Sequence, residues 1–169
     1  MRKSLLALIG QDRLPARLHT FKTTEDGRAY AQRETRTIAL KNYSNDSISS
    51  WAKEANKVTL FHEMGHFVEY DDSALAIATK DWIKSRATGN PEKLSKLTKN
   101  PGYRDDEEAY PDKFADPYVG KIYTYGASEV ISMGVEYLSS PSEARKFFAK
   151  DPEHFYLTVG TLITGRKKQ

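Results

Sequence analysis

The chain of 169 residues contains no cysteine. This absence excludes disulfide bonds, thiolate metal ligands and a cysteine nucleophile, and it fits a reducing compartment. Long apolar runs are also lacking. No stretch approaches the roughly 20 residues of a membrane span. The run from Leu5 to Ile9 in "MRKSLLALIGQ" is shorter than the roughly 7 to 15 residues of a signal-peptide core. We therefore expect no membrane partner and a protein that stays in the cell.

A strong excess of one charge is absent as well. The 26 Lys and Arg residues nearly balance 23 Asp and Glu residues, which gives a formal net charge of +3. The basic run "GRKKQ" at 165–169 is interpreted as a solvated terminus. No nucleic-acid partner is expected.

The length and composition predict a single domain over 1–169. Hydrophobic residues make up 38% of the chain and charged residues 29%, which is typical of a globular protein with a polar surface. The lead-in at 1–17 and the tail at 165–169 are the segments where we expect disorder.

The N-terminal part predicts a small β-sheet. Runs rich in Thr, Tyr, Phe and Ile predict strands near 18–22, 28–32 and 35–41. The dipeptide Asp26-Gly27 predicts a hairpin between the first two strands. The segment "TRTIALKN" is predicted to supply a sheet edge that an extended substrate could join by strand addition.

Helices are predicted on both sides of an irregular middle. "SWAKEANKVTLFHEMGHFVEYDD" and "SALAIATKDWIKSRATGN" predict helices that end at Asp71-Asp72 and at Gly89. Residues 91–118 predict a long functional loop, in which the acidic run 105–108 is interpreted as solvated rather than as a second metal site.

The C-terminal third predicts three helices, from "GASEVISMGVEYL", "SPSEARKFFAK" and "DPEHFYLTVGTLITG". Ser140-Pro141 and Asp151-Pro152 each place an N-cap residue before a proline at the first helical position.

The stretch "TLFHEMGHFVEY" places polar residues on an apolar helix. His62 and His66 are four residues apart, so both imidazoles lie on one face and can reach one Zn²⁺ ion. Glu63 is placed to take a proton from a water that such an ion makes acidic. His-Glu-x-x-His is the arrangement of zinc metallopeptidases. The alternative is a degenerate or structural relic of such a site.

Two histidines leave the metal site short of a ligand. His19 and His154 lie far away in the sequence and are interpreted as surface or satisfied histidines. Glu129 and Glu136 are seven residues apart and project from one face of a predicted helix, so either carboxylate could complete the site.

Two further features of this region bear on the site. Glycine inside a helix suggests the close approach of another backbone, so Gly65 and Gly134 predict that the histidine and glutamate helices meet at these residues. The phenols of Tyr123 and Tyr125 could stabilise an oxyanion at a peptide carbonyl, or they could be plain packing residues.

These segments resemble a known family. "TLFHEMGHFVEY", "DKFADPYVGKIYTYGASEVISMGVEYL" and "DPEHFYLTVGTL" are together similar to the metallopeptidase domain of tailed-phage and prophage proteins, often found at the C-terminus of minor head or head-morphogenesis proteins. The similarity covers residues 28–164. More distantly, a tyrosine before a helix with a glutamate ligand resembles the catalytic domain of anthrax lethal factor.

The resemblance implies an α+β, zincin-like fold that is mainly helical, with a small β-sheet over the histidine helix. It implies Zn²⁺ as the cofactor, His62, His66 and Glu129 as ligands, and Glu63 as general base. Glu136 is then left to hold a histidine N–H.

The implied function is zinc-dependent hydrolysis of a peptide or protein substrate. Phage structural proteins are the other partners implied, and the host cytoplasm or the virion is the implied location. The alternative is a head-assembly component that keeps a zinc-binding domain for structure, and a secreted or injected toxin peptidase is a weaker third hypothesis. Only a peptidase needs Glu63, because a structural zinc site normally has four protein ligands.

Overall fold

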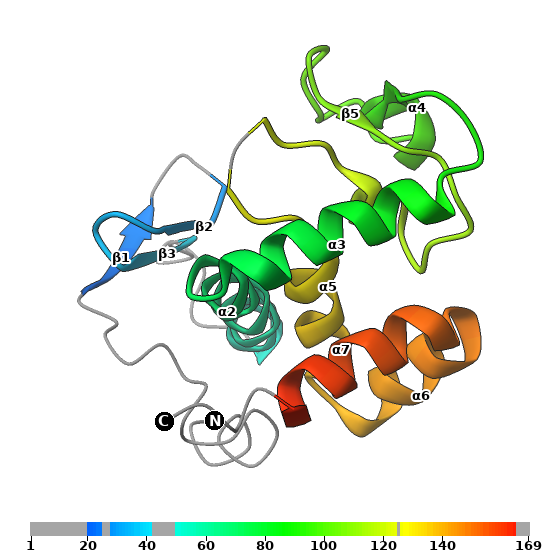
Figure 1. The fold of residues 1–169 in the computed structure, drawn as a ribbon. Helices are drawn as coiled ribbons and strands as arrows, with labels where there is room; N and C mark the ends of the chain where they lie inside the picture. The colour runs from blue at the N-terminus through cyan, green and yellow to red at the C-terminus, as the bar shows by residue number, and fades with distance from the viewer. Residues whose placement is uncertain (1–19, 25–27, 42–49, 125, 165–169) are drawn as a thin grey trace.

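The described part of the chain is a mixed α+β fold in which over half of the residues are helical (Figure 1). The computed structural model describes residues 20–24, 28–41, 50–124 and 126–164. The predicted lead-in and the basic tail lie outside these ranges. Within them, no helix is both long enough and apolar enough to cross a membrane.

A three-stranded sheet forms the N-terminal part. Its strands are β1 (Thr20–Thr24), β2 (Tyr30–Gln32) and β3 (Thr37–Lys41), in the order β1-β3-β2. β3 is parallel to β1 and antiparallel to β2. The three predicted strands are therefore confirmed to within a few residues.

Two predictions about this sheet are wrong, because β3 lies in its centre. The first two strands are not neighbours, so they form no hairpin, and Asp26-Gly27 lies outside the described residues. The tight turn joins β2 to β3 and includes Arg36, at a φ of 52°. "TRTIALKN" supplies no free edge, since β3 pairs on both sides. Its buried start, Thr37 to Ala39, explains the central place, and the edge strands are β1 and β2.

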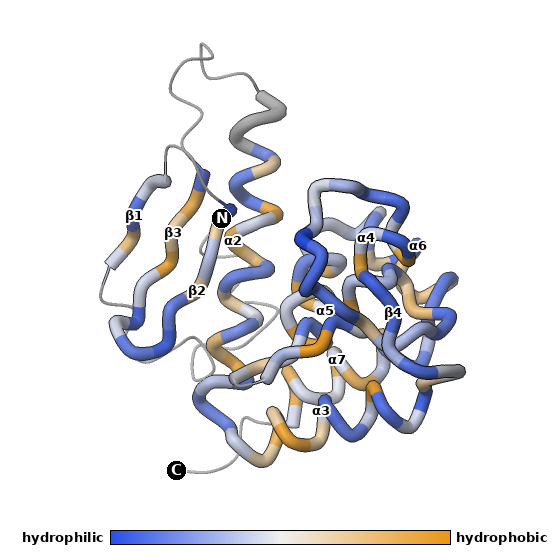
Figure 2. The backbone as a smooth tube through the Cα atoms, turned by 90° about the horizontal axis from the view of Figure 1, so that it is seen from above, coloured by the Kyte–Doolittle hydropathy of each residue, from blue (hydrophilic) through white to orange (hydrophobic). Residues whose placement is uncertain are grey.

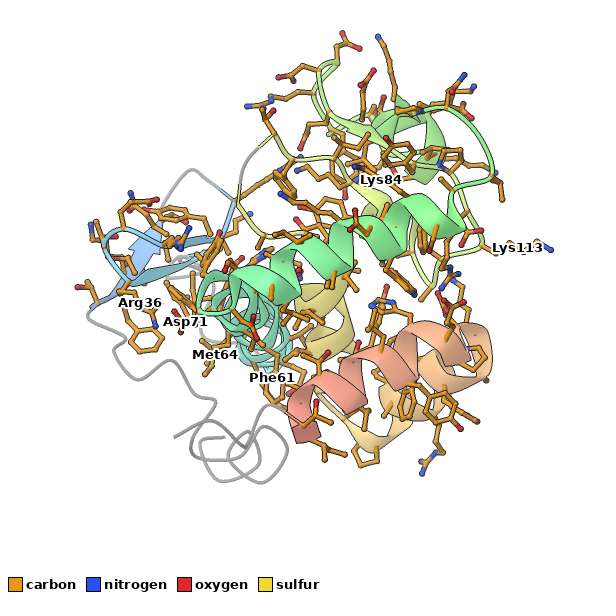
Figure 3. The ribbon with its side chains drawn as sticks, viewed as in Figure 1. Arg36, Phe61, Met64, Asp71, Lys84 and Lys113 are labelled. Atoms are coloured by element: carbon orange, nitrogen blue, oxygen red, sulfur yellow. The ribbon has the colours of Figure 1, made fainter. Side chains whose placement is uncertain are left out.

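Helix α2 (Ser50–Tyr70) carries the histidine motif, and its prediction from the sequence is confirmed. Figure 2 shows the sheet along one side of α2 and the other helices on the opposite side. Phe61 and Phe67 are buried in the core between these layers. At the end of α2, Arg36 Nη2 donates to Asp71 Oδ2 at 2.9 Å, which ties the β2–β3 turn to the helix (Figure 3).

Helix α3 (Ser73–Arg86) follows at once. Asp72 caps it by accepting a hydrogen bond from the Leu75 N–H at 3.0 Å. The helix ends before the predicted Gly89, because Thr88 N–H instead bonds to the Pro111 carbonyl at 2.9 Å.

Three helices form the C-terminal part: α5 (Val130–Tyr137), α6 (Pro141–Lys150) and α7 (Pro152–Thr164). Both predicted N-caps are confirmed. Ser140 accepts from the Glu143 N–H and Asp151 accepts from the His154 N–H. His154 is fully buried and its Nε2 lies 2.7 Å from the Val130 carbonyl, but its buried Nδ1 has no hydrogen-bond partner among the described residues, so the histidine is satisfied at one ring nitrogen only. His19 lies outside the described residues.

Helices α2 and α5 cross at Gly65. A Cβ at Gly65 would lie 2.5 Å from the Ser132 Cα, so only glycine allows this approach. The predicted meeting of Gly65 with Gly134 is wrong, because Gly134 faces α7, where a Cβ would lie 2.1 Å from Thr158 Oγ1. Two residues along a helix turn by about 200°, so Ser132 and Gly134 point to different neighbours.

The middle segment is more ordered than the predicted loop. It contains β4 (Glu92–Lys93), α4 (Leu94–Thr98), β5 (Glu108–Ala109) and the 3₁₀-helix η2 (Pro117–Gly120). β4 and β5 pair antiparallel. The acidic run is only partly solvated, as Glu107 is 6% exposed. Its Oε1 accepts from Lys121 Nζ at 2.7 Å and from Arg28 Nη1 at 3.0 Å.

The Glu107 pairing predicts acid-sensitive stability. Burial alone would raise the pKa of Glu107, but the hydrogen bonds from Lys121, Arg104 and Arg28 lower it to about 2. A carboxyl group whose pKa is lowered in the folded state stabilises the fold at pH values above its ordinary pKa. This contribution is lost as the pH falls through the pKa of the folded state. Glu107→Gln should therefore reduce the free energy of unfolding by about 3 kcal/mol near pH 7, with a smaller reduction below about pH 3.

Urea unfolding at several pH values measures this difference. Glu108→Gln is the matched control, because Glu108 is the exposed neighbour, and it should change little. A difference between wild type and Glu107→Gln that stays constant down to about pH 2 would contradict the assignment.

Candidate metal centre

Two histidine side chains converge one turn apart on α2. The rings of His62 and His66 have centroids 5.0 Å apart and lie nearly perpendicular, at 84°. Their side chains are 13% and 12% exposed. They stand on either side of Gly65, where α5 comes closest, so any ligand that α5 provides arrives between them.

Glu129 is that ligand candidate. It is the N-cap residue of α5, and its side chain is 1% exposed. Its Oε2 lies 3.2 Å from His62 Nε2 and 3.5 Å from His66 Nε2. All three ligand atoms lie within 4.8 Å of one another. His62, His66 and Glu129 are therefore close enough together to bind a metal ion.

The separations favour a shared ion over simple hydrogen bonds. Ligands about 2.1 Å from a tetrahedral ion lie about 3.4 Å from one another, which matches both distances from Glu129 Oε2. A charged hydrogen bond would instead bring the oxygen to about 2.8 Å from one nitrogen. One oxygen that faces two ring nitrogens at these longer distances is the arrangement of a chelate.

Glu136 lies on the other nitrogen of His62. Its Oε2 is 2.9 Å from His62 Nδ1. A proton on Nδ1 donated to this carboxylate leaves the lone pair on Nε2, which faces Glu129. The sequence left Glu129 and Glu136 as alternatives, and the fold places them at opposite nitrogens of the same ring.

The buried ionisable groups of the cluster shift one another's pKa values. Burial would lower the pKa of His62, but hydrogen bonds to Glu129 and Glu136 raise it to about 10. Burial would raise the pKa of Glu129, but His66 and His62 hold it well below its usual range. Burial lowers the pKa of His66 to about 4. Glu129 is thus ionised and His66 neutral, which are the forms that bind metal, whereas His62 is protonated in the metal-free protein and must lose its Nε2 proton when a metal binds.

A cavity of about 220 Å³ opens beside the cluster. Glu63, 4% exposed, lines it together with the three ligand candidates. Burial raises the pKa of Glu63 to about 7. Tyr30 and Ala31 of β2 line the cavity, and Tyr70 lies beside them with its hydroxyl 3.5 Å from the Ala31 carbonyl oxygen. Tyr118 and Tyr123 also line it and form a tyrosine wall.

The two tyrosines predicted from the sequence have different outcomes. Tyr123 lies in the cavity and its hydroxyl donates to Glu129 Oε1. Burial and the Glu129 charge raise its pKa, so the phenol keeps its proton. Tyr125 lies outside the described residues.

Tyr118 was missed by the sequence reasoning. Its ring centroid is 6.4 Å from that of His62, and burial together with Glu129 raises its pKa. Asp116-Pro117 is the same N-cap signal that located two C-terminal helices, and Asp116 does cap η2 by accepting from the Tyr118 N–H. That signal could have placed Tyr118 in an ordered turn.

The two walls of the cavity are joined through Glu107. On the tyrosine side, Lys121 Nζ lies 5.1 Å from the Tyr118 ring centroid and 4.7 Å from that of Tyr123. On the strand side, Arg28 lies two residues before β2. Because Glu107 binds both cations, the segment predicted as a loop helps to fix the width of the cavity.

The geometry predicts which changes remove the metal. Purified protein should hold about one divalent ion per chain, and His62→Ala, His66→Ala or Glu129→Ala should each lower zinc affinity by an order of magnitude or more, because too few donors remain. Competition with a chromogenic chelator measures the affinity. Full zinc retention by all three variants would rule out the site.

Replacing Glu136 should lower zinc affinity less than replacing one of the three ligand candidates. Glu136→Ala keeps all three ligand candidates but frees the His62 ring to rotate, so zinc affinity should fall about 10- to 100-fold. The same titration, run beside Glu129→Ala, compares the two carboxylates. If Glu136→Ala loses the metal and Glu129→Ala retains it, the two roles are reversed.

Comparisons with known proteins do not add to this geometry. No protein-family model, curated protein or solved structure matches the chain. The resemblance to phage metallopeptidase domains therefore stays a prediction from the motifs, and any functional assignment depends on the arrangement of the chain's own side chains.

Proposed function

We propose that this chain is a zinc-dependent peptidase with a zincin-like fold, related to the metallopeptidase domains of tailed-phage and prophage head proteins. The observation that carries the proposal is the buried Glu63 carboxylate. It lines the same cavity as the three ligand candidates but is not one of the three convergent ligand atoms. A binding site alone has no need of this residue, whereas a hydrolase needs a base there.

The number of ligands supports catalysis over a structural role. Structural zinc sites normally have four protein ligands, and catalytic sites keep one position open. Among the described residues, His62, His66 and Glu129 form the one such group, without a fourth member. Zinc bound there would supply a water of lowered pKa and would polarise a carbonyl oxygen.

Glu63 is suited to carry protons near neutral pH. A pKa of about 7 lets the carboxylate accept a proton from the attacking water and later give it to the leaving nitrogen. Its position directly after His62 on a packed helix fixes it beside the cluster. In the proposed reaction Glu63 is therefore both general base and general acid.

The tyrosine wall is suited to the developing negative charge. The buried Tyr123 and Tyr118 phenols keep their protons and can donate to an oxyanion formed at the substrate carbonyl. The single hydroxyl proton of Tyr123 is donated to Glu129, so Tyr123 would have to leave this carboxylate in order to donate to the oxyanion. Tyr118 is an addition to the residues proposed from sequence.

The strand wall is suited to an extended peptide. β2 pairs with β3 on one side only. On its other side the Ala31 carbonyl accepts from the Tyr70 hydroxyl at 3.5 Å, so an added strand would replace that contact. Tyr30 and Ala31 of β2 line the cavity that holds Glu63. A peptide or protein substrate is thus proposed to lie along β2, across the metal cluster.

Glu63→Gln tests the proposal. The amide keeps the shape of the side chain but cannot accept the proton, so hydrolysis of a mixed peptide library should fall by about 100- to 10,000-fold while zinc binding persists. Mass spectrometry of the library and metal analysis of the same samples provide the two readouts. Glu54→Gln is the matched control, since Glu54 is exposed on the same helix.

Three outcomes decide between the hypotheses. Loss of hydrolysis in Glu63→Gln alone supports a peptidase. Undiminished hydrolysis in that variant would remove Glu63 from the mechanism. A wild-type protein that binds zinc but cleaves no peptide would favour the head-assembly alternative.

A further inference from the structure

A second buried carboxylate on α2 has no part in the proposed chemistry. Glu69 lies three residues after His66 and is 1% exposed. It accepts three hydrogen bonds from two different elements. Thr79 Oγ1 of α3 donates to its Oε1, as does Ser128 Oγ at 2.8 Å, and the Ser128 N–H donates to its Oε2 at 3.0 Å.

Ser128 is the residue before the ligand candidate Glu129. Its hydroxyl oxygen also accepts from the Val130 N–H at 3.1 Å, which is the first N–H of α5. The backbone is therefore bound on both sides of Glu129. The side chain of Glu129 makes no capping hydrogen bond of its own, so Ser128 replaces it as the acceptor at this helix start.

Burying the Glu69 carboxylate is energetically costly, which indicates that this residue has a role that an apolar residue could not perform. Burying a carboxylate costs several kcal/mol unless its oxygens are well satisfied. An apolar residue would fill the core without that cost, but it could not bind a backbone N–H and a hydroxyl of Ser128 together. Glu69 provides two acceptor oxygens for Ser128, and the position of Ser128 determines where the next residue, Glu129, lies.

We propose that Glu69 is a positioning residue that fixes the metal ligand Glu129 by holding Ser128. This inference rests on the proposed metal site. Glu69 and His66 lie one turn apart on the same helix. By binding Ser128, Glu69 therefore fixes the position of Glu129 relative to the histidines of α2. Thr79 of α3 contacts the same carboxylate and takes no part in holding Ser128.

Glu69→Gln tests this role with little change in volume. A glutamine keeps one acceptor oxygen for the Ser128 N–H, but its amide group donates, so the Ser128 and Thr79 hydroxyls can no longer donate to that end of the side chain. Zinc affinity should fall about 10- to 100-fold, as for other groups that orient metal ligands. Ser128→Ala, which loses the hydroxyl and keeps the N–H, should weaken zinc binding by less, and it provides a second test if Glu69→Gln fails to fold.

Thr79→Val is the matched control. It removes a hydrogen bond from the same buried carboxylate but leaves both contacts to Ser128. Its melting temperature should fall like that of Glu69→Gln, and its zinc affinity should equal that of wild type. Equal zinc affinity in Glu69→Gln and wild type, or an equal loss in Thr79→Val, would overturn the inference.

Amide hydrogen exchange in metal-free protein gives a readout that does not depend on zinc. Residues 128–130 should exchange faster in Glu69→Gln and Ser128→Ala than in Thr79→Val, and equal rates in the three would overturn the inference. A wild-type protein without zinc affinity would overturn the metal site itself, whereas wild-type affinity with no effect of Glu69→Gln overturns only the role of Glu69.

Discussion

The close crossing of α2 and α5 at Gly65 is the constraint on which the candidate centre depends. The Ser132 Cα occupies the space that a Cβ at Gly65 would need. This approach brings the start of α5 between the two histidines, and it places Glu129 within reach of both ring nitrogens. A larger residue at Gly65 would separate the helices and leave a pair of histidines without a carboxylate.

The crossing also concentrates acidic groups in the interior. Glu63, Glu69 and Glu129 are all nearly fully buried on or against α2, and each has a different environment. Glu129 faces imidazoles and stays ionised, whereas burial raises the pKa of both Glu63 and Glu69 to about 7. Glu69 differs from Glu63 because three donors hold its oxygens. Different environments for neighbouring carboxylates are a common way to give them different roles.

The segments that line the cavity beside the candidate centre are joined by ion pairs rather than by regular secondary structure. The β2 strand and the tyrosines Tyr118 and Tyr123 lie far apart in the sequence, and neither segment is a long element. Glu107 joins them by binding Arg28 on one side and Lys121 on the other. Protonation of this carboxylate would weaken both contacts.

Local signals in the sequence determined much of the molecule. The four-residue spacing of His62 and His66 set two imidazoles on one helical face, with Glu63 beside them. N-cap residues before prolines located α6 and α7. Helical spacing and capping depend on neighbours along the chain, so they can be read without knowledge of the fold.

Tertiary structure decided what depends on distant residues. The central place of β3 follows from its pairing with strands on either side, and the partner of Gly65 follows from how α5 is rotated between α2 and α7. Tyr118 and Glu107 gained their places from contacts across the cavity. Helical spacing alone left Glu129 and Glu136 as alternatives, seven residues apart, and the family resemblance favoured Glu129. Only the packing of that helix against α2 placed Glu129 at the Nε2 atoms of His62 and His66, and Glu136 at the Nδ1 atom of His62.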